Sequence, residues 1–556
     1  MGGALPILLL TLACAPSEAT FRASAAERPS ASTAPPSADD GEQTGALLLN
    51  EMMASNDSVV MDEHLDADDW VELYNASDAA ISLDGWSLSH EDRGCPGWAL
   101  PADGTLESGG RLLVWLDDEP DEGSLHADFS LDAEEGSLRL CAPGDLAADS
   151  LSWSDLPSDL VLARFPDGGA LVAESARATP NNPNPWDPGT DLDPSDALFD
   201  PDHVLTVELW LPDDSLAALQ QDPYTYVEGA IGFQGVWLEP VGVRVKGQWG
   251  SYRTLDQKVA LKVKLDEYDS ELRLRGLSHL TLNNMVQDPS TVRERLAYTL
   301  FRDAGVPAPR TGYVALYLNG EYRGLYDDVE TIDETFLGRW FEDAQGNLYE
   351  GAYGQDLTEG SYTSLLLHQQ GDDDVAAYSE LAVLAALLAQ EPSEARVAEL
   401  EALVDVDSVL RMWAVEVLTG HWDGYFYYPN NYRVYHDPST GLLTLLPWGT
   451  DQTFSWTGSL DLPAGDLAAW CLEIPSLERR FELALWDAAD RERALGLDED
   501  AEAAWTLAEP WLEADPYKET TMDSALYYYE YALDFVHTWP DAVAAELFPD
   551  GEPAVE

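Results

Sequence analysis

The chain has 556 residues, of which 103 are Asp or Glu and only 29 are Lys or Arg, so its formal net charge is −74. A chain of this length exceeds one compact core, and at least two domains are expected. The strong negative charge disfavours binding to nucleic acid and to anionic membrane surfaces. Hydrophobic residues make up 45% of the chain and include 19 Trp, which excludes a disordered acidic polymer.

The N-terminus carries a short apolar run that ends in Ala13 and Cys14. Its length suits the core of a signal peptide and is too short to span a bilayer. Residues 11–14 resemble a bacterial lipoprotein box, in which Cys14 would be lipidated, whereas cleavage near Ala19 would give a freely secreted protein. We therefore expect a signal peptide over residues 1–19, export to the cell envelope or the medium, and membrane contact only through an N-terminal lipid.

The next two segments differ sharply in composition. Residues 20–44 are rich in Ala, Ser, Pro and Glu, which predicts a disordered tether. Residues 45–184 instead contain short alternating apolar runs broken by Gly, Asp and Pro, which predicts an all-β sandwich of roughly seven to nine strands. The segments DWVELYNASDAAISLDGWSLS, LESGGRLLVWLDD and ADFSLDAEEGSLRLC resemble successive strands of a bacterial lamin-tail domain. The resemblance implies an immunoglobulin-like module that binds a partner or acts as a spacer.

Cysteine and histidine are sparse in this domain. Cys95 and Cys141 both fall within it, and an exported chain can join them in a disulfide. Cys471 is then left over as a buried thiol. His64 and His90 are isolated in the sequence, so we expect surface or core roles for them rather than metal ligation.

Residues 185–202 are rich in Pro and Asp and mark a domain boundary. Alternate Asp side chains on an extended loop can bind Ca²⁺ through their oxygens. The segment lacks the Gly and the final Glu of an EF-hand loop, so a solvated linker is the favoured interpretation.

From residue 203 to 548 predicted strands and helices alternate. A turn containing Gly247, Gly250 and Ser251 could wrap phosphate groups through backbone N–H groups, although a plain hairpin would have the same sequence. In the strand that follows, period two places three lysines, at positions 258, 262 and 264, on one face. That face is either solvated or pairs with phosphate.

Four segments of this region, taken together, resemble the CotH family of spore-coat atypical protein kinases. They are VRVKGQWGSYRTLDQKVALKVKLD, LTLNNMVQDPSTVRERLAYTLFRDAGVPAPRTGYVALYLNGEYRGLYDDVETID, HWDGYFYYPNNYRVYHD and LLPWGTDQTF. The resemblance implies an α+β, protein-kinase-like domain with a helical C-terminal lobe. It also implies ATP and Mg²⁺ or Mn²⁺ as cofactors, and a Ser or Thr of a surface or secreted protein as the phosphate acceptor.

The same resemblance implies a role for each polar residue of these motifs. The implied cofactor-binding residues are Lys262 or Lys258, with Glu294 as the acidic partner, and Gly247, Gly250 and Ser251 over the phosphates. The implied catalytic base is Asp423, and the implied metal ligands are Asp451 and Asn430 or Asn431.

Two departures from the family pattern bear on activity. The family often reads Pro-Trp-Asp-x-Asp, whereas Gly449 replaces the first aspartate here, and Tyr-Tyr-Pro lengthens the loop between Asp423 and the asparagine pair. Two hypotheses therefore remain open. One is an exported kinase, and the other is a catalytically inactive surface structural or adhesion protein that uses the lamin-tail module to hold a partner.

Overall fold

The structure is a computed structural model that describes residues 47–549, except for positions 63, 65, 78, 91–92, 155, 170, 177, 182–183, 185–192, 234–235, 249, 271, 352 and 369–377. The expected signal peptide, tether and lipidated Cys14 therefore lie outside the described residues. Within the described part of the chain, no helix is both long enough and apolar enough to cross a membrane.

The first domain consists of antiparallel β-sheets with a main apolar core and a second, smaller buried cluster that includes Met53, Trp70 and Val161. The larger sheet has the order β11-β10-β1-β2-β7, a second has the order β5-β4-β8-β9, and β3 pairs with β6. Leucines and valines from both larger sheets, such as Leu49, Val71 and Leu140, are buried in one cluster, which is the arrangement of a β-sandwich. The strands are β1 (Leu47–Met53), β2 (Trp70–Asn75), β3 (Ile81–Ser82), β4 (Ser87–His90), β5 (Trp98–Ala99), β6 (Thr105–Leu106), β7 (Arg111–Trp115), β8 (Glu135–Ala142), β9 (Leu146–Ser154), β10 (Val161–Phe165) and β11 (Leu171–Ser175).

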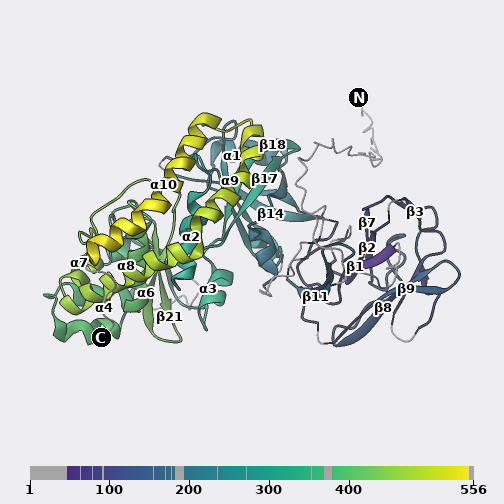
Figure 1. Ribbon diagram of the computed structural model, residues 1–556, viewed down its shortest axis with the longest axis horizontal. Helices are drawn as coiled ribbons and strands as arrows, with labels where there is room; N and C mark the ends of the chain where they lie inside the picture. The colour runs from purple at the N-terminus through teal and green to yellow at the C-terminus, as the bar shows by residue number, and fades with distance from the viewer. Residues whose placement is uncertain are drawn as a thin grey trace, which may run out of the picture. The chain divides into compact units, whose positions relative to one another are not determined.

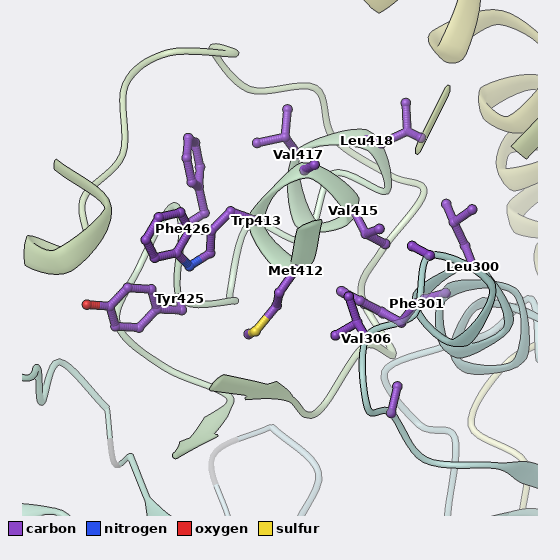
Figure 2. Close-up of a cluster of buried hydrophobic side chains, with 14 of the residues drawn as sticks. Leu300, Phe301, Val306, Met412, Trp413, Val415, Val417, Leu418, Tyr425 and Phe426 are labelled. Carbon is purple, nitrogen blue, oxygen red and sulfur yellow. The ribbon is translucent and has the colours of Figure 1, made fainter. Parts of the chain in front are cut away.

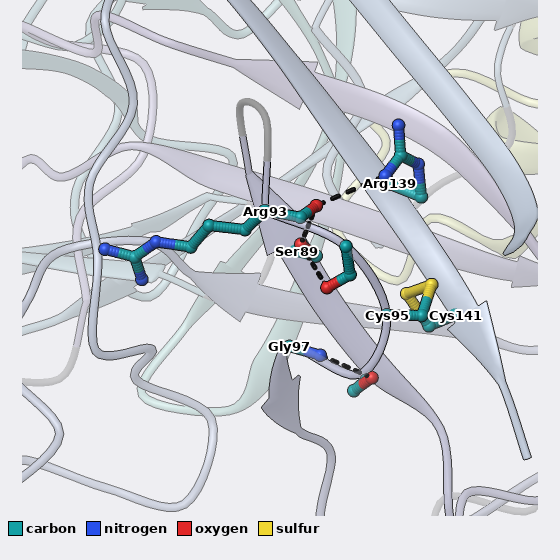
Figure 3. Close-up of a disulfide and its surroundings, with 8 residues drawn as sticks. Ser89, Arg93, Cys95, Gly97, Arg139 and Cys141 are labelled. Carbon is teal, nitrogen blue, oxygen red and sulfur yellow. Dashed lines mark hydrogen bonds between the residues drawn. A yellow bond between two sulfur atoms is a disulfide. The ribbon is translucent and has the colours of Figure 1, made fainter. Parts of the chain in front are cut away.

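A disulfide joins Cys95 to Cys141, with 5.7 Å between the two Cα atoms (Figure 3). Cys141 lies in β8 opposite Ser87 of β4, so the bond fastens the segment before β5 to the second sheet. The pairing is the one expected from the sequence. Cys471 is a buried free thiol, also as expected.

Little of the Asp-rich linker is described, but its last part already has cationic partners. Asp193 caps the 3₁₀-helix η1 (Pro194–Phe199) and, with Asp196, forms ion pairs with Arg310. Asp200 pairs with His203. These carboxylates therefore neutralise side chains of the following domain, which speaks against the Ca²⁺ ligation that the sequence left open for them.

The second domain begins with a closed β-barrel in the order β12-β13-β14-β15-β16-β18-β17. Alternating residues fill it: Leu261 and Val263 of β15 are buried inside, whereas Lys262 and Lys264 lie on the opposite face. Figure 1 labels β14, β17 and β18 of the barrel. Its elements are β12 (Leu205–Trp210), α1 (Asp213–Gln221), β13 (Val227–Phe233), β14 (Val236–Lys246), β15 (Ala260–Lys264), η2 (Leu265–Glu267), β16 (His279–Asn283), α2 (Arg293–Asp303), β17 (Thr311–Leu318), β18 (Glu321–Val329) and α3 (Glu334–Trp340).

The rest of the domain consists of a four-stranded sheet and helices. The sheet has the order β20-β19-β21-β22. Its elements are β19 (Leu348–Glu350), η3 (Tyr362–Ser364), β20 (Leu366–His368), α4 (Ser379–Leu388), η4 (Glu394–Arg396), α5 (Val397–Glu401), α6 (Val406–Leu418), β21 (Tyr432–Asp437) and β22 (Leu442–Pro447). The expected helical C-terminal lobe comprises α7 (Asp466–Leu472), α8 (Pro475–Leu495), α9 (Leu497–Ala514) and α10 (Met522–Leu547), and α10 packs against both α8 and α9 (Figure 1).

Helix α6 lies at the centre of the apolar core of this part. Asp405 caps it by accepting a hydrogen bond from the backbone N–H of Ser408. The helix is hydrophobic nearly all round, as a buried helix must be, and its Met412 and Val415 share a cluster with Phe301 of α2 (Figure 2). A rigid α6 fixes the start of the loop that follows it, and that loop carries the polar residues singled out in the sequence.

Candidate functional site

The loop between α6 and β21 is held by a buried glutamate. The carboxylate of Glu416 accepts hydrogen bonds from the backbone N–H groups of Tyr425 at 3.0 Å and Phe426 at 2.7 Å. Burial raises the pKa of Glu416 to about 8, and these two hydrogen bonds oppose the rise. Gly424 is required by close packing, because a Cβ there would lie 2.5 Å from Glu416 Oε1 and 2.6 Å from His421 Cδ2. The sequence His-Trp-Asp-Gly is thus fitted to one glutamate beneath it.

The loop brings Asp423 together with both asparagines. The side-chain amides of Asn430 and Asn431 donate to Asp423 Oδ1 and Oδ2, each at 3.0 Å. Burial raises the pKa of Asp423, and these two donors oppose the rise. Because each amide uses its nitrogen on Asp423, its oxygen is left to face another group, as a metal ligand would.

The turn after β22 lies against this loop. His421 Nε2 is 3.2 Å from the carbonyl oxygen of Trp448, and the backbone N–H of Trp448 donates to the carbonyl of Asn431. Burial lowers the pKa of His421 to about 4, so the ring is neutral near pH 7. Asp451 follows three residues after Trp448, and Asp423 is one of the charges acting on it. The two motifs therefore form one site.

The charge of Asp451 acts on a lysine, Lys246, which is the last residue of β14. Burial lowers the pKa of Lys246, and the negative charges of Glu294 and then Asp451 oppose the lowering. Glu294 lies in the first turn of α2 and accepts a hydrogen bond from Asn283 at 2.5 Å. The lysine on which the charge of Glu294 acts is therefore Lys246 rather than Lys258 or Lys262.

Buried carboxyl groups outnumber the single lysine around Lys246. Burial raises the pKa of Glu294 to about 8, with the charge of Asp451 adding to the rise, and burial raises the pKa of Asp451 to about 7. Asp327 of β18 is also buried, its pKa is raised well above the usual value, and its Oδ1 has no hydrogen-bond partner in the described part of the chain. Such a set suits a bound cation, because one lysine cannot neutralise several buried carboxylates.

The lysines expected to bind nucleotide occupy two different environments. Lys258 precedes β15, is 3% exposed, and pairs with Asp515 while its Nζ lies 4.1 Å from the centre of the Tyr326 ring. Its charge is therefore used within the fold. Lys262 lies on the outer face of β15 opposite Arg244 of β14. Burial and, to a lesser extent, the charge of Arg433 lower the pKa of Lys262 to about 7.

The glycine turn follows directly on Lys246. A Cβ on Gly250 would lie 2.9 Å from the side-chain amide of Gln287, and the carbonyl of Ser251 accepts a hydrogen bond from Asn284. Gly247 packs similarly close to Ser251. The turn borders an open hollow of about 570 Å³ lined by Tyr224, Gln248, Gly250 and Tyr252. The turn thus begins directly after Lys246 and is anchored to the segment before α2.

Trp448 joins the two halves of the site. Lys246 Nζ lies 5.7 Å and the Arg433 guanidinium carbon 5.1 Å from the centre of the Trp448 ring. Both distances lie within the range of cation–π attraction. The indole therefore places two positive charges beside the Asp423 and Asp451 loops, which is an arrangement that can receive phosphate groups.

Two residues of the site, Lys246 and Glu416, were not expected from the sequence. Lys246 stands in the glycine-turn motif, whereas the nucleotide lysine was expected among the lysines that follow it in the sequence. Its signal is its place at the end of a strand directly before the turn. Glu416 sits within an apolar helix and is 0% exposed. A charged residue in a run of buried positions is itself a signal, because a buried charge needs partners.

A barrel followed by a helical lobe, with a lysine–glutamate pair and an Asp–Asn loop beside a second aspartate, defines the class of kinase-like proteins. The chain belongs to the CotH kinase protein family, whose model matches residues 243–539, more than half of its length. The lamin tail domain model matches residues 41–155. The expected fold class is thereby confirmed: an all-β lamin-tail domain followed by an α+β CotH domain with C-terminal helices.

The relatives share part of their length with this chain. Inner spore coat protein H of Bacillus subtilis is 29% identical over 195 residues, covering 32% of this chain and 51% of that protein. Invasin CotH2 of Rhizopus delemar is 28% identical over 174 residues, covering 29% of each chain. The matches thus span about half or less of these relatives. The structure of the Helicobacter pylori proinflammatory kinase CtkA aligns with 58% of this chain and 92% of its own at 8% identity, with a TM-score of 0.24, too low to bear on the fold.

Proposed function

We propose that this protein is an exported kinase that transfers the γ-phosphate of ATP to a Ser or Thr hydroxyl of a surface or secreted protein. The observation that carries the proposal is the convergence of Lys246, Glu294 and Asp451 with the loop of Asp423 and its asparagines. Phosphoryl transfer depends mainly on positioning and charge neutralisation, and these are the residue types that supply both.

The donor set fits the cofactors that the family implies. Carboxylate oxygens of Asp451 and amide oxygens of Asn430 or Asn431 are ligands that Mg²⁺ and Mn²⁺ prefer. The orphaned Oδ1 of buried Asp327 is a further reason to expect a cation near this set. When bound, ATP with its metal ion supplies the phosphoryl group and part of the charge neutralisation.

The residues of the chain would divide the work as follows. Lys246 faces the nucleotide phosphates and is oriented by Glu294. Asp423 would accept the proton of the acceptor hydroxyl while the oxygen of that hydroxyl bonds to the γ-phosphorus. The bond from that phosphorus to the bridging oxygen would break at the same time, and ADP would leave with the electron pair. The proton is then held on a carboxylate that Asn430 and Asn431 keep in place.

The test is transfer of labelled γ-phosphate from ATP with Mn²⁺ to a panel of exported proteins and to the chain itself. Asp423→Asn keeps the size of the side chain and removes the base, so transfer should fall by roughly 100-fold or more. Asp128→Asn, a change in the lamin-tail domain, is the control and should leave the rate unchanged. Transfer that is equal in the wild type and in both Asp423→Asn and Asp451→Asn would overturn the proposed site.

A second candidate is a surface protein that keeps the kinase-like fold without catalysis. The specific observation in its favour is Gly449, which stands where the family often has a carboxylate. Two related proteins carry the name invasin. This candidate predicts no labelled product from wild type and no change in melting temperature with millimolar ATP and Mn²⁺. An active kinase predicts a labelled product and a change in melting temperature.

A further inference from the structure

Two acidic segments of the lamin-tail domain bring four metal-ligating side chains together. Asp62 and His64 lie in the segment between β1 and β2, and Glu122 and His126 lie in the segment after β7. The ligand atoms that these four residues offer all lie within 4.8 Å of one another. His64, which looks isolated in the sequence, therefore has three potential co-ligands from a distant part of the chain.

The separations approach those of a tetrahedral metal site. His64 Nδ1 lies 3.3 Å from Glu122 Oε2 and 3.5 Å from Asp62 Oδ2. His126 Nδ1 lies 3.8 Å and 4.0 Å from the same two oxygens. Donors bound to zinc at 2.0–2.1 Å in a tetrahedron are about 3.4 Å apart. Four of the six separations among the donors therefore lie within about 0.6 Å of the tetrahedral value.

An unpartnered oxygen points into this cluster. The Asp62 side chain is fully buried, and its Oδ1 accepts hydrogen bonds from the backbone N–H groups of His64 and Asp66. Its other oxygen, Oδ2, lies on the side of the two imidazoles and is buried without a hydrogen-bond partner among the described residues. A buried carboxylate oxygen left in this state is costly unless a cation binds it.

The two segments that carry the four ligands contain no lysine or arginine. The segments 56–69 and 116–131 carry no Lys or Arg, although acidic residues occur throughout both. Near the ligands, Asp68 experiences the negative charges of Asp117, Asp62 and Asp66 in addition to its own burial. Apart from protonation of His64 and His126 themselves, a positive charge that balances this cluster must therefore come from outside the two segments.

We propose that Asp62, His64, Glu122 and His126 bind a zinc ion that fastens the two segments of the lamin-tail domain to each other. Two imidazole nitrogens favour zinc over Mg²⁺ and Ca²⁺, which prefer all-oxygen sites. His126 Nδ1 also lies 2.5 Å from Asp117 Oδ2. When that nitrogen binds the metal it can no longer donate to Asp117, so metal binding replaces this hydrogen bond.

The site is open to exchange on one side. The His64 side chain is 45% exposed and that of Glu122 is 24% exposed, whereas Asp62 and His126 are buried. Zinc can therefore enter from solvent without unfolding the domain. Substitution of the two partly exposed ligands also leaves the buried half of the cluster in place, which makes them suitable for a test.

The test uses the full chain, freed of metal by chelation and titrated with Zn²⁺ alone by calorimetry, with bound zinc counted by atomic emission. The wild type should bind one tight zinc ion. His64→Ala and Glu122→Gln should each weaken binding by at least about tenfold. Co²⁺ in place of zinc should give visible absorption bands in the wild type that are lost in His64→Ala.

Two control variants separate this site from other sources of zinc binding. His537→Ala removes another exposed histidine that lies 3.2 Å from a carboxylate, Asp498, and should bind zinc like the wild type. Asp451→Asn alters the proposed kinase site and should also retain the tight ion. Equal zinc affinity in wild type, His64→Ala and Glu122→Gln would overturn the proposal, as would loss of the tight ion in Asp451→Asn alone.

Discussion

At the scale of single residues, the backbone conformation and close packing at position 449 explain why a glycine stands there instead of the aspartate common in the family. Its φ is +59°, and a Cβ there would lie 2.9 Å from the Cγ atom of Asn431. Its backbone N–H donates to the hydroxyl of Tyr298. A side chain at this position would therefore displace Asn431, whose amide is bonded to Asp423. In this chain the glycine at position 449 leaves room for Asn431 to bond to Asp423. Asp451 is then the carboxylate of this motif that remains for a metal ion.

Gly449→Ala should combine backbone strain with a steric clash. Gly305→Ala is a matched control, because its φ is +72° and no atom lies within 4 Å of the added Cβ. We expect Gly305→Ala to lower the free energy of unfolding by about 1 kcal/mol and Gly449→Ala to lower it by at least about 2 kcal/mol. Urea unfolding measures both, and equal losses would show that Asn431 is not crowded.

Glu492 of α8 should make stability depend on pH. It is 3% exposed, and both carboxylate oxygens lack hydrogen-bond partners among the described residues. Burial raises its pKa well above the usual value. The folded state thus holds a proton that the unfolded state has already lost, so the free energy of unfolding falls as pH rises above the ordinary glutamate pKa.

Glu492→Gln should remove this part of the pH dependence. The amide cannot ionise, so the variant should be more stable than the wild type by about 1–3 kcal/mol near neutral pH, with a smaller difference at about pH 4. Urea unfolding across this range measures the difference. Glu502→Gln, an exposed position on α9, should follow the wild-type curve. A Glu492→Gln curve parallel to the wild type would contradict the assignment.

At the scale of elements, the loop from His421 to Asn431 depends on the helix before it. Glu416 on α6 binds two backbone N–H groups of the loop, and His421 fixes the loop to the turn after β22. The position of Asp423 therefore follows from α6, which packs against α8 and β22 and also against α2 (Figure 2). The geometry of the proposed catalytic loop thus depends on core packing.

Glu416→Gln should loosen this loop while keeping the volume of the side chain. One amide oxygen can accept one of the two N–H groups, but the amide nitrogen faces the other donor. We expect the free energy of unfolding to fall by about 1–3 kcal/mol and phosphate transfer to fall with it. Hydrogen exchange at Tyr425 and Phe426 should speed up. Unchanged exchange at both amides would contradict the role given to Glu416.

The sequence predicted elements better than it predicted partners. The alternating apolar runs of residues 45–184 form the β-sheets of the first domain, as expected, and the C-terminal lobe is helical, as the family resemblance implied. Period two also placed Lys262 and Lys264 on one face. It did not show that β15 starts at Ala260 and that Lys258 reaches Asp515, 257 residues away. The Lys246 partnership and the cluster around His64 likewise join distant segments, which local periodicity does not report.

At the scale of the whole molecule, the chain combines two domains with different sources of stability. The kinase-like domain has extensive apolar cores, whereas the lamin-tail domain is smaller and adds the Cys95–Cys141 disulfide. The disulfide closes a loop with a sequence separation of 46 residues. Its contribution should therefore appear in the lamin-tail domain alone.

Replacing both Cys95 and Cys141 with Ser should lower the stability of the lamin-tail domain by about 3–4 kcal/mol, the value expected for a loop of this length. The transition of the kinase-like domain in a calorimetric scan, and any phosphate transfer, should be unchanged. Cys471→Ser is the control for loss of a cysteine outside the disulfide. A shift of both transitions by the double replacement would contradict this division.

Calorimetric titration of the full chain with ATP in the presence of Mn²⁺ tests the proposed nucleotide site most directly. We expect saturable, metal-dependent binding to the wild type and at least about tenfold weaker binding to Lys246→Met, since a charge-assisted phosphate contact is lost. Lys264→Met, a lysine on the barrel paired with Glu267, should bind like the wild type. Wild-type affinity in Lys246→Met, or no binding of ATP to the wild type, would contradict the account.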